Sequence, residues 1–332
     1  MHILILGAGG MIGRKLTAAL LAAGGLGERA LSRLTLADVV APPLPTQPRP
    51  ATAIPVTALA ADLSDPAAAA RLAALRPEVI FHLAAIVSGE AEADFDKGYR
   101  INLGGTTALL EAIRAEGAQD RYCPRLVFTS SIAVFGAPFP ARIPDDFAPQ
   151  PLTSYGTQKA MGELLLNDYS RRGLVDGVGI RLPTVVIRPG APNRAASGFF
   201  SSILREPLVG LEAVLPVPRD TRHWFCSPRA AVGFLTHAGA MDTAPLGARR
   251  SLSVPGLSAT VAEELAALER VAGPAALRLI REEPDETVAR IVAGWPQDFD
   301  ASRARALGFT GDASFDDIVR QHVEEELGGR IG

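Results

Sequence analysis

A tyrosine and a lysine four residues apart, Tyr155 and Lys159, are the side chains of this 332-residue sequence whose types and spacing best suit chemistry. Of the 33 basic residues only Lys15, Lys97 and Lys159 are lysines, so a lysine at this position is a rare choice. Four positions along a helix advance about 6 Å and return to the same face. A phenol and a compact ammonium would then share one site, where the positive charge favours the deprotonated phenol. The alternative is a solvated helix face that carries both residues by chance.

Ser131 adds a hydroxyl group to this pair. It stands 24 residues before Tyr155 and follows the apolar run Arg125 to Thr129, which is typical of a buried strand. Hydroxyls at the carboxyl ends of sheet strands lie on the ligand-binding edge of α/β folds, so we expect Ser131 to hydrogen-bond a substrate oxygen. For the neighbouring Ser130 we expect only hydrogen bonds to strand-end amide groups.

A glycine-rich turn indicates a nucleotide site. Gly7, Gly10 and Gly13 follow the apolar run His2 to Leu6 and open a predicted helix, where backbone N–H groups would meet a pyrophosphate. Asp38 ends the second predicted strand, 25 residues after Gly13, where a carboxylate accepts hydrogen bonds from ribose hydroxyls. Its charge would repel a 2′-phosphate, so the pattern favours NAD over NADP. A sterically tight turn and a strand-end turn residue are the alternative explanations.

The ends of the third and fourth predicted strands give weaker signals. Asp62 and Leu63 could meet an adenine, the carboxylate facing its amino group and the leucine packing on the ring, or Asp62 could cap the helix that begins near Pro66. His82 has no carboxylate or metal-ligand spacing beside it, so we expect a packed strand residue rather than a catalytic base.

Strands and helices alternate over the first 180 residues, which predicts an α/β fold with a Rossmann-type doubly wound parallel sheet. The expected strands are 2–6, 34–38, 54–60, 79–83, 125–129 and 177–182, and the expected helices 11–23, 66–75, 102–116 and 154–171. Beyond Leu182 prolines interrupt the pattern, with helices near 230–240, 261–272 and 312–326. We therefore predict a nucleotide-binding domain over 1–182, to which the chain returns around 226–255, and a smaller C-terminal substrate-binding lobe over 183–225 and 256–332.

The bulk composition excludes several classes of protein. A formal charge of −3 and a pI near 6.0 offer no basic surface for nucleic acid. Cys123 and Cys226 are too few for a disulfide scaffold or a cysteine metal site. Since no basic leader and no uncharged apolar run of about 18 residues is present, we expect a cytoplasmic protein without a membrane partner or a metal.

Together these motifs resemble the extended short-chain dehydrogenases/reductases, the NAD-dependent epimerase/dehydratase family, over nearly all of the chain. Phe135 stands where the family usually has tyrosine, a conservative departure. The matching residues are Gly7, Gly10, Gly13, Asp38, Asp62-Leu63, His82-Leu83-Ala84-Ala85, Asn102, Gly105-Thr106, Ser131, Val134-Phe135-Gly136, Tyr155 and Lys159.

The resemblance implies roles for these residues. Tyr155, Lys159 and Ser131 would be catalytic, with Tyr155 as the base and its pKa lowered by Lys159 and the oxidised nicotinamide. NAD would be bound by Gly7, Gly10, Met11, Ile12, Gly13, Asp38, Asp62, Leu63, Ala84, Asn102, Tyr155, Lys159 and Pro183. The substrate would be bound by Ser88, Ser131, Tyr155, Arg188, Asn193 and Arg222. Family members also dimerise through two helices, here those of 102–116 and 154–171, so a homodimer is expected.

The chain departs from the nucleotide-sugar members at two segments. Arg181-Leu182-Pro183-Thr184 replaces their usual asparagine, and Cys226-Ser227-Pro228-Arg229 replaces their His-Val-Asp-Asp. Ile132-Ala133 also lacks the acidic pair that sugar dehydratases need. A planar guanidinium binds a carboxylate through two parallel hydrogen bonds, so we expect Arg222 or Arg188 to hold an acidic substrate.

Three stretches, 188–193, 199–207 and 221–228, resemble D-erythronate dehydrogenases. This resemblance implies NAD-dependent oxidation of the carbon-2 hydroxyl of a small sugar acid, D-erythronate, to 2-oxo-D-erythronate. A nucleotide-sugar epimerase or an L-threonine-type dehydrogenase of the same family is the alternative enzyme. A non-catalytic NAD-sensing binding protein is the alternative from another class.

Overall fold

A seven-stranded sheet forms the centre of the computed structural model, which describes residues 1–46, 53–190 and 197–332. Its strand order is β12-β8-β7-β6-β1-β4-β5. The pairings β1–β4, β1–β6, β4–β5 and β6–β7 are all parallel, which confirms the predicted doubly wound sheet. The strands are β1 His2–Leu6, β4 Arg33–Asp38, β5 Val56–Ala60, β6 Val79–His82, β7 Arg125–Ser131, β8 Asp176–Leu182 and β12 Ser251–Ser253.

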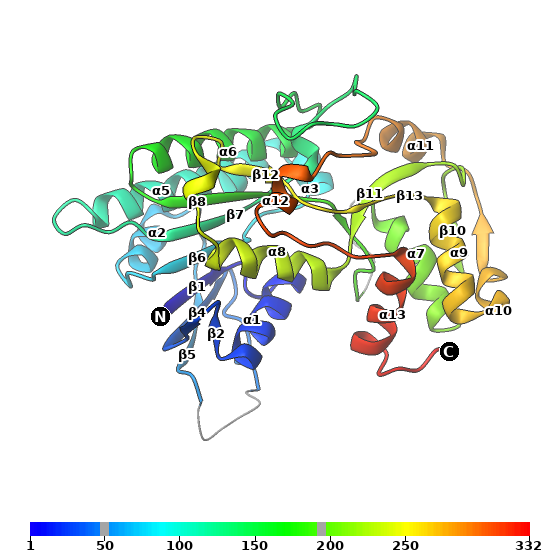
Figure 1. The fold of residues 1–332 in the computed structure, drawn as a ribbon, viewed down its shortest axis with the longest axis horizontal. Helices are drawn as coiled ribbons and strands as arrows, with labels where there is room; N and C mark the ends of the chain where they lie inside the picture. The colour runs from blue at the N-terminus through cyan, green and yellow to red at the C-terminus, as the bar shows by residue number, and fades with distance from the viewer. Residues whose placement is uncertain (47–52, 191–196) are drawn as a thin grey trace. The chain divides into compact units, whose positions relative to one another are not determined.

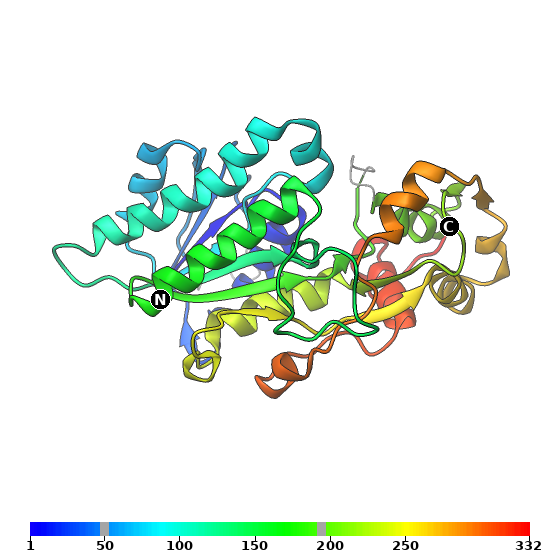
Figure 2. The ribbon, with the colours of Figure 1, turned by 90° about the horizontal axis from the view of Figure 1, so that it is seen from above.

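Helices cover both faces of this sheet. Figure 1 shows α2, α5 and α6 on one face and α1 and α8 on the other. Seen from above, α5 and α6 run side by side (Figure 2). Their apolar stripes bury leucines and isoleucines against the strands, as amphipathic helices in α/β folds do. The helices are α1 Met11–Ala23, α2 Pro66–Ala73, α5 Gly105–Glu116, α6 Ser154–Arg171 and α8 Pro228–Ala240.

Short elements connect this framework. They are β2 Gly25–Leu26, β3 Arg29–Ala30, α3 Ser88–Ala93, α4 Phe95–Gly98, the π-helical segment η2 Tyr99–Gly104, and the 3₁₀ turns η3 Ile132–Val134 and η4 Ala244–Leu246.

The chain divides into two compact units. Unit 1 comprises Met1–Val134, Thr153–Arg181 and Val232–Leu252, and unit 2 comprises Phe135–Leu152, Leu182–Ala231 and Ser253–Gly332. These bounds differ from the predicted domains, because residues 135–152 belong to unit 2 and the return to unit 1 is confined to 232–252. The assignment of NAD binding and substrate binding to separate parts of the chain stays a prediction.

Unit 2 has its own core of buried aliphatic and aromatic side chains, in which Phe200, Phe225 and Leu268 are fully buried. Its sheets are β13-β11-β9 and β10-β14. The strands are β9 Thr184–Val185, β10 Ala213–Leu215, β11 Arg222–Cys226, β13 Leu257–Thr260 and β14 Ile280–Glu282. The helices are α7 Gly198–Leu208, α9 Val261–Ala272, α10 Pro274–Leu277, α11 Glu286–Ala293, α12 Ser302–Ala306 and α13 Phe315–Glu326.

Some predicted element bounds were wrong. The helix expected at 102–116 begins at Gly105 and is preceded directly by η2, in which the Asn102 side chain bonds the backbone of Ile86. The helix expected at 312–326 begins only at Phe315, since Ser314 accepts a hydrogen bond from the Asp317 amide and caps it. The proline-rich segment beyond Leu182 also contains α7, whose last turn tolerates Pro207.

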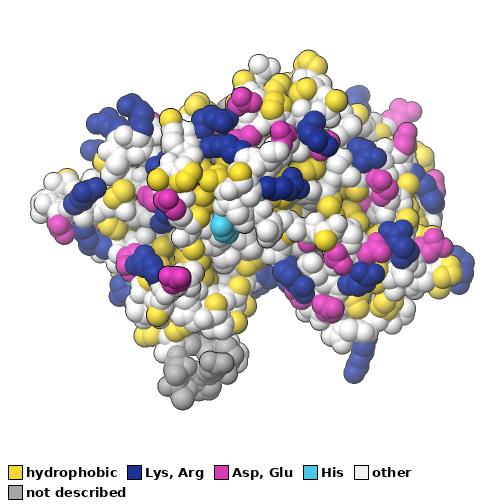
Figure 3. Space-filling view, in the orientation of Figure 1, with side chains coloured by type: hydrophobic (Ala, Val, Ile, Leu, Met, Phe, Trp, Pro, Cys, Tyr) yellow, Lys and Arg dark blue, Asp and Glu magenta, His cyan; other side chains and the backbone are white. Residues whose placement is uncertain are grey.

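Charges on the surface are mixed. On the face drawn in Figure 3, basic and acidic side chains are interspersed, in keeping with the formal charge of −3. Among the described helices, none combines the length and apolar composition needed to cross a membrane. Within the described ranges no group of three or more His, Cys, Asp or Glu side chains is placed to hold a metal ion.

Candidate active site

The glycine turn lies where the strand order of the sheet reverses, between β1 and β6. Gly7 has a φ of +82°, and a Cβ on it would lie 2.7 Å from the backbone nitrogen of Ala84, which follows β6. A Cβ on Gly13 would lie 2.3 Å from the carbonyl oxygen of Gly7. Gly10, the N-cap of α1, supplies no side-chain cap, so the first backbone N–H groups of the helix remain available as donors at its positive end. This concave turn, in which Met11 and Ile12 begin the helix, fits a pyrophosphate.

Asp38 stands beside this turn at the end of β4. One carboxylate oxygen accepts the Gly9 amide at 2.9 Å and the other accepts the Val39 amide at 2.7 Å. Each oxygen keeps further acceptor capacity, and the side chain is partly exposed. The carboxylate therefore fits the hydroxyls of an adenosine ribose, as the sequence predicts.

Asp62 does not cap the following helix, so that alternative was wrong. Asp65 is the N-cap of α2 and accepts the Ala67 amide at 2.9 Å. Asp62 instead accepts the amide and hydroxyl of Ser64, at 2.9 and 2.7 Å, and these hydrogen bonds hold the pKa of its carboxyl below the ordinary value. Leu63 is buried in the core of unit 1. Contact of Asp62 and Leu63 with an adenine stays a prediction.

Asn102 is buried and holds the loop after β6. Its amide oxygen accepts the Ile86 amide at 2.8 Å, and its nitrogen donates to the Ile86 carbonyl at 3.2 Å and to Gln158 at 2.8 Å. These contacts use the polar atoms of the side chain, so Asn102 positions the loop that carries Ala84 and leads to Ser88 at the start of α3. Direct contact of Asn102 with a cofactor stays a prediction.

His82 is a packed strand residue, as predicted. Its Nε2 lies 2.9 Å from the Thr106 hydroxyl, and burial, with a smaller effect of the Lys159 charge, lowers its pKa to about 3. The ring is therefore neutral at physiological pH.

Tyr155, Lys159 and Ser131 come together in unit 1. Thr153 caps α6 by accepting the Gly156 amide at 3.0 Å, which starts the helix one residue before Tyr155. Lys159 is only 3% exposed and donates from Nζ to the carbonyl of Thr129 at 2.8 Å. The Ser131 hydroxyl interacts with the phenol of Tyr155 and accepts the Ala133 amide at 3.1 Å.

The predicted lowering of the Tyr155 pKa by Lys159 is not seen. Burial raises the pKa of Tyr155 to about 12, and the group that lowers it is the Ser131 hydroxyl. Lys159 Nζ lies 5.7 Å from the centre of the tyrosine ring, and burial lowers its own pKa to about 8. A charge that is itself disfavoured by desolvation at this distance acts only weakly on the phenol.

Ser130 does not satisfy strand-end amides, which corrects the prediction. Its hydroxyl donates to Oε1 of Glu163 at 2.5 Å. Glu163 in turn accepts from Arg181 on β8, with Nη2 2.8 Å from Oε2. Sequence reasoning missed Glu163, although it stands four residues after Lys159 and so on the same helix face.

The arginines predicted to bind substrate lie in unit 2 and differ in their partners. Arg222 bonds Ser258 and lies 3.4 Å from the Glu263 carboxylate. Arg188 donates to the carbonyl and hydroxyl of Ser197, at 3.1 and 2.8 Å, and no acidic partner of it is recorded among the described residues. Burial, followed by the charge of Arg205, lowers the pKa of Arg188.

Two other predicted residues complete the set. Pro183 is buried and follows β8 at the start of unit 2. Asn193 lies outside the described residues.

Comparison with known proteins places this geometry in a family. The model of the NAD dependent epimerase/dehydratase family matches residues 3–224. The chain belongs to this family. NAD is the family's cofactor, and the glycine turn with Asp38 provides the donors and the acceptor that it needs.

Individual relatives in the family match the chain along its length. A D-erythronate dehydrogenase of Cupriavidus necator is 48% identical over 329 residues, 98% of this chain and 98% of its own. A D-erythronate dehydrogenase of Haemophilus influenzae is 42% identical over 328 residues, 98% of this chain and 100% of its own.

A solved structure described as a nucleoside-diphosphate-sugar epimerase of Agrobacterium tumefaciens matches with a TM-score of 0.96 and 60% identity, covering 100% of this chain and 96% of that one. A GalE-like L-threonine dehydrogenase of C. necator matches with a TM-score of 0.80 and 25% identity, covering 98% of this chain and 99% of that one.

Proposed function

We propose that this chain is an NAD-dependent dehydrogenase that oxidises the carbon-2 hydroxyl of D-erythronate to 2-oxo-D-erythronate. The observation that carries the proposal is the full-length similarity to two D-erythronate dehydrogenases, at 48% and 42% identity. The grouping of Ser131, Tyr155 and Lys159 in unit 1 supports a reaction at a hydroxyl-bearing carbon.

In the proposed reaction the phenolic oxygen of Tyr155 takes the proton of the substrate hydroxyl. The Ser131 hydroxyl donates a hydrogen bond to the same substrate oxygen as it becomes a carbonyl. Bound NAD⁺ supplies the hydride acceptor. Because the Tyr155 pKa is about 12 in the structure, the base needs positive charge nearby in the reacting complex. The oxidised nicotinamide of NAD⁺ carries such a charge, whereas the Lys159 ammonium acts only weakly on the phenol.

We also propose that Arg188 orients the substrate carboxylate. Arg222 already faces the Glu263 carboxylate, whereas Arg188 donates to the carbonyl and the hydroxyl of Ser197. Since no acidic partner of Arg188 is found in the described part of the chain, this partly buried guanidinium would gain most from a bidentate pair with a carboxylate. Arg222 remains the second candidate for this role.

A sugar-nucleotide epimerase is the competing function, favoured by the 60% identity to the A. tumefaciens structure described as one. Against it stand the departures from the nucleotide-sugar pattern at Arg181–Thr184 and Cys226–Arg229. An L-threonine dehydrogenase is less supported, at 25% identity. A non-catalytic NAD-sensing protein would not need the grouped Ser131, Tyr155 and Lys159.

A panel of substrates tests these functions. The purified protein is incubated with NAD⁺ or NADP⁺ and D-erythronate, L-threonine or a UDP-sugar, and NADH absorbance is followed. We expect NADH only with D-erythronate and NAD⁺. Turnover of L-threonine alone, or epimerisation of the UDP-sugar without release of NADH, would replace the proposal. No turnover with any of them would favour the sensing protein.

We further propose that the protein acts in the cytoplasm as a homodimer formed through α5 and α6. The support is the partly exposed apolar surface of α6, where Leu164 is 68% exposed and Met161 39%. Light scattering of the purified protein measures the mass of the particle, and a monomeric mass at micromolar concentration would exclude the dimer.

A further inference from the structure

Three consecutive residues of β7 contact three successive turns of α6. The Thr129 carbonyl accepts from Lys159, the Ser130 hydroxyl donates to Glu163, and the Ser131 hydroxyl interacts with Tyr155. Tyr155, Lys159 and Glu163 recur at intervals of four residues and so line one face of the helix. The register of α6 on β7 therefore decides whether Tyr155 meets Ser131.

The Glu163 contact has the most hydrogen bonds of the three. Glu163 is 4% exposed, and its carboxylate accepts the Ser130 hydroxyl at 2.5 Å. The Arg181 guanidinium binds it side-on, from Nε at 3.0 Å to Oε1 and 3.2 Å to Oε2 and from Nη2 at 2.8 Å to Oε2. One side chain of α6 thus ties the helix to both β7 and β8.

The apolar packing beside this contact is also close. A Cβ on Gly162 would lie 2.6 Å from Cζ of Phe128, so α6 approaches β7 at the position next to Glu163. Packing of this kind fixes the distance between helix and strand but tolerates small slides along the strand. Directed hydrogen bonds do not tolerate such slides, because they weaken steeply when distance and angle change.

We propose that Glu163 is a positioning residue for the dehydrogenase reaction, acting through Ser130 and held by Arg181. Its carboxylate sets the register of α6 so that the Tyr155 phenol meets Ser131 and the Lys159 ammonium meets the Thr129 carbonyl. This inference rests on the proposed function for its kinetic consequence, and on the three contacts for its geometry.

The first variant is Ser130→Ala, which removes the link to β7 while leaving the Glu163–Arg181 ion pair in place. We expect kcat with D-erythronate to fall roughly 10- to 100-fold, since a misplacement of about 1 Å costs rates of that order. KM for D-erythronate should change much less than kcat. A Ser130→Ala variant with the parental kcat would overturn the proposal.

The matched control is Ser170→Ala on the same helix. Ser170 is also buried, and its hydroxyl accepts the Gly177 amide at 3.2 Å, so its removal also costs α6 a hydrogen bond to a strand, fifteen residues from Tyr155. We expect the parental kcat in this variant. An equal fall of kcat in both serine variants would mean that α6 responds to any lost hydrogen bond, and would contradict a specific role of Ser130 and Glu163.

A double variant, Glu163→Met with Arg181→Met, separates positioning from folding. It replaces both members of the buried ion pair by apolar side chains of similar length, a change that folds often tolerate. We expect a melting temperature near that of the parent and a kcat as low as in Ser130→Ala. A stable double variant with the parental kcat would show that the pair is only structural.

A readout without substrate or cofactor tests the geometry itself. Because the chain has only three lysines, lysine labelled with ¹³C at Cε alone gives three NMR signals, and the Lys159 signal is the one lost in Lys159→Arg. This signal should shift in Ser130→Ala and in the double variant, and stay in place in Ser170→Ala. A fall of kcat without any shift would exclude a change of register. If the parent does not oxidise D-erythronate, the proposed function fails while the NMR result still decides the register.

Discussion

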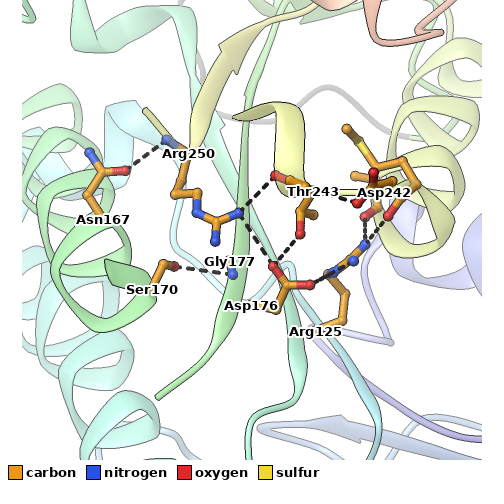
Figure 4. A network of polar contacts seen from close by, with 11 residues as sticks. Arg125, Asn167, Ser170, Asp176, Gly177, Asp242, Thr243 and Arg250 are labelled. Carbon is orange, nitrogen blue, oxygen red and sulfur yellow. Dashed lines mark hydrogen bonds and ion pairs between the residues drawn. The ribbon is translucent and has the colours of Figure 1, made fainter. Parts of the chain in front are cut away.

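At the carboxyl edge of the sheet in unit 1, Lys159 lies buried with a carbonyl as its hydrogen-bond partner, whereas at the amino edge of the same sheet Asp176 lies between two arginines. Figure 4 shows this second arrangement. Arg125 donates from Nε and Nη2 to Asp176, at 2.9 and 2.7 Å, and from Nη1 to the carbonyls of Ala238 and Met241. Thr243 and Arg250 complete the set of donors to Asp176.

We interpret the difference as one between groups proposed to take part in the reaction and groups that stabilise the fold. At the amino edge, opposite charges meet and their hydrogen bonds are satisfied, so the network joins the starts of β7 and β8 to the loop before β12. At the carboxyl edge, Lys159 and Tyr155 carry pKa values of about 8 and about 12, both displaced by desolvation in the direction that disfavours charge. Such displaced groups cost stability and are typical of reactive sites.

A cavity of about 700 Å³ also opens at the amino edge, where Glu78, Tyr122, Cys123, Arg125 and Asp176 are among its lining residues. Glu78 pairs with Arg29, and Arg125 with Asp176. Charged side chains that are paired in this way offer little to an ionic ligand, so cavity volume alone is a poor guide to the active site.

The largest expected effect is that of Tyr155→Phe. Without the phenolic oxygen no group takes the substrate proton, so kcat should fall roughly 10³-fold. The matched control is Tyr122→Phe at the amino edge, where the hydroxyl donates to the Pro77 carbonyl at 2.8 Å. We expect parental kcat there, measured as NADH formation with D-erythronate. Similar kcat values in Tyr155→Phe and Tyr122→Phe would contradict the proposal that only the carboxyl edge takes part in the reaction.

Lys159→Met should lower activity roughly 10²-fold and yet stabilise the fold. Burial lowers the Lys159 pKa from its ordinary value of 10.5 to about 8. Below pH 8 the ammonium is therefore charged and buried in the folded protein but charged and hydrated in the unfolded chain, and this difference destabilises the fold. Between about pH 8 and 10.5 the unfolded chain binds more protons, and this residue makes the parent's stability rise with pH.

We therefore expect the free energy of unfolding of Lys159→Met at pH 7 to exceed that of the parent by about 1–3 kcal/mol. The gap should shrink as the pH rises through that window. Urea unfolding at pH 7 and pH 10 measures it. A variant less stable than the parent at pH 7 would show that the hydrogen bond to Thr129 outweighs the desolvation of the charge.

Asp176→Asn should have effects opposite to those of Lys159→Met: a lower free energy of unfolding and an unchanged kcat. The amide cannot balance the charges of Arg125 and Arg250, which are both largely buried. We expect a loss of about 2 kcal/mol in the free energy of unfolding, moderated by the partial exposure of the carboxylate. Urea unfolding together with the NADH assay checks both parts. A kcat reduced at temperatures where the variant is fully folded would mean that the two edges are coupled.

Arg188→Ala and Arg222→Ala extend the comparison to unit 2 and carry the smallest expected effect. Removing a guanidinium that binds a carboxylate should raise KM for D-erythronate roughly 10-fold while KM for NAD⁺ stays within about 2-fold. We expect this result for Arg188→Ala, and a nearly parental KM for Arg222→Ala because that arginine faces Glu263. A larger rise of KM for D-erythronate in Arg222→Ala than in Arg188→Ala would instead indicate that Arg222 binds the substrate carboxylate.

Local signals in the sequence were enough for the framework and for the grouping of Tyr155 with Lys159. The bounds of α1, α6 and α9 agree with the prediction at both ends, because residues close in the sequence determine them. Gly24 ends α1 in the left-handed conformation, Thr153 caps α6, and Thr260 with Glu263 forms a capping box on α9. The four-residue spacing of Tyr155 and Lys159 likewise placed them on one face without knowledge of the fold.

Only the tertiary structure decided which groups compensate one another. Ser130 finds its acceptor 33 residues away in Glu163, and Glu163 its counter-charge 18 residues further in Arg181. Asp176 collects donors from residues 125, 243 and 250. Hydrogen-bond partners and pKa values depend on distances between atoms and on the exclusion of water. Residue types and their spacing in the sequence do not determine either of these. For this reason the sequence predicted Tyr155 and Lys159 as the reactive pair, and the structure showed that desolvation governs the pKa values of both.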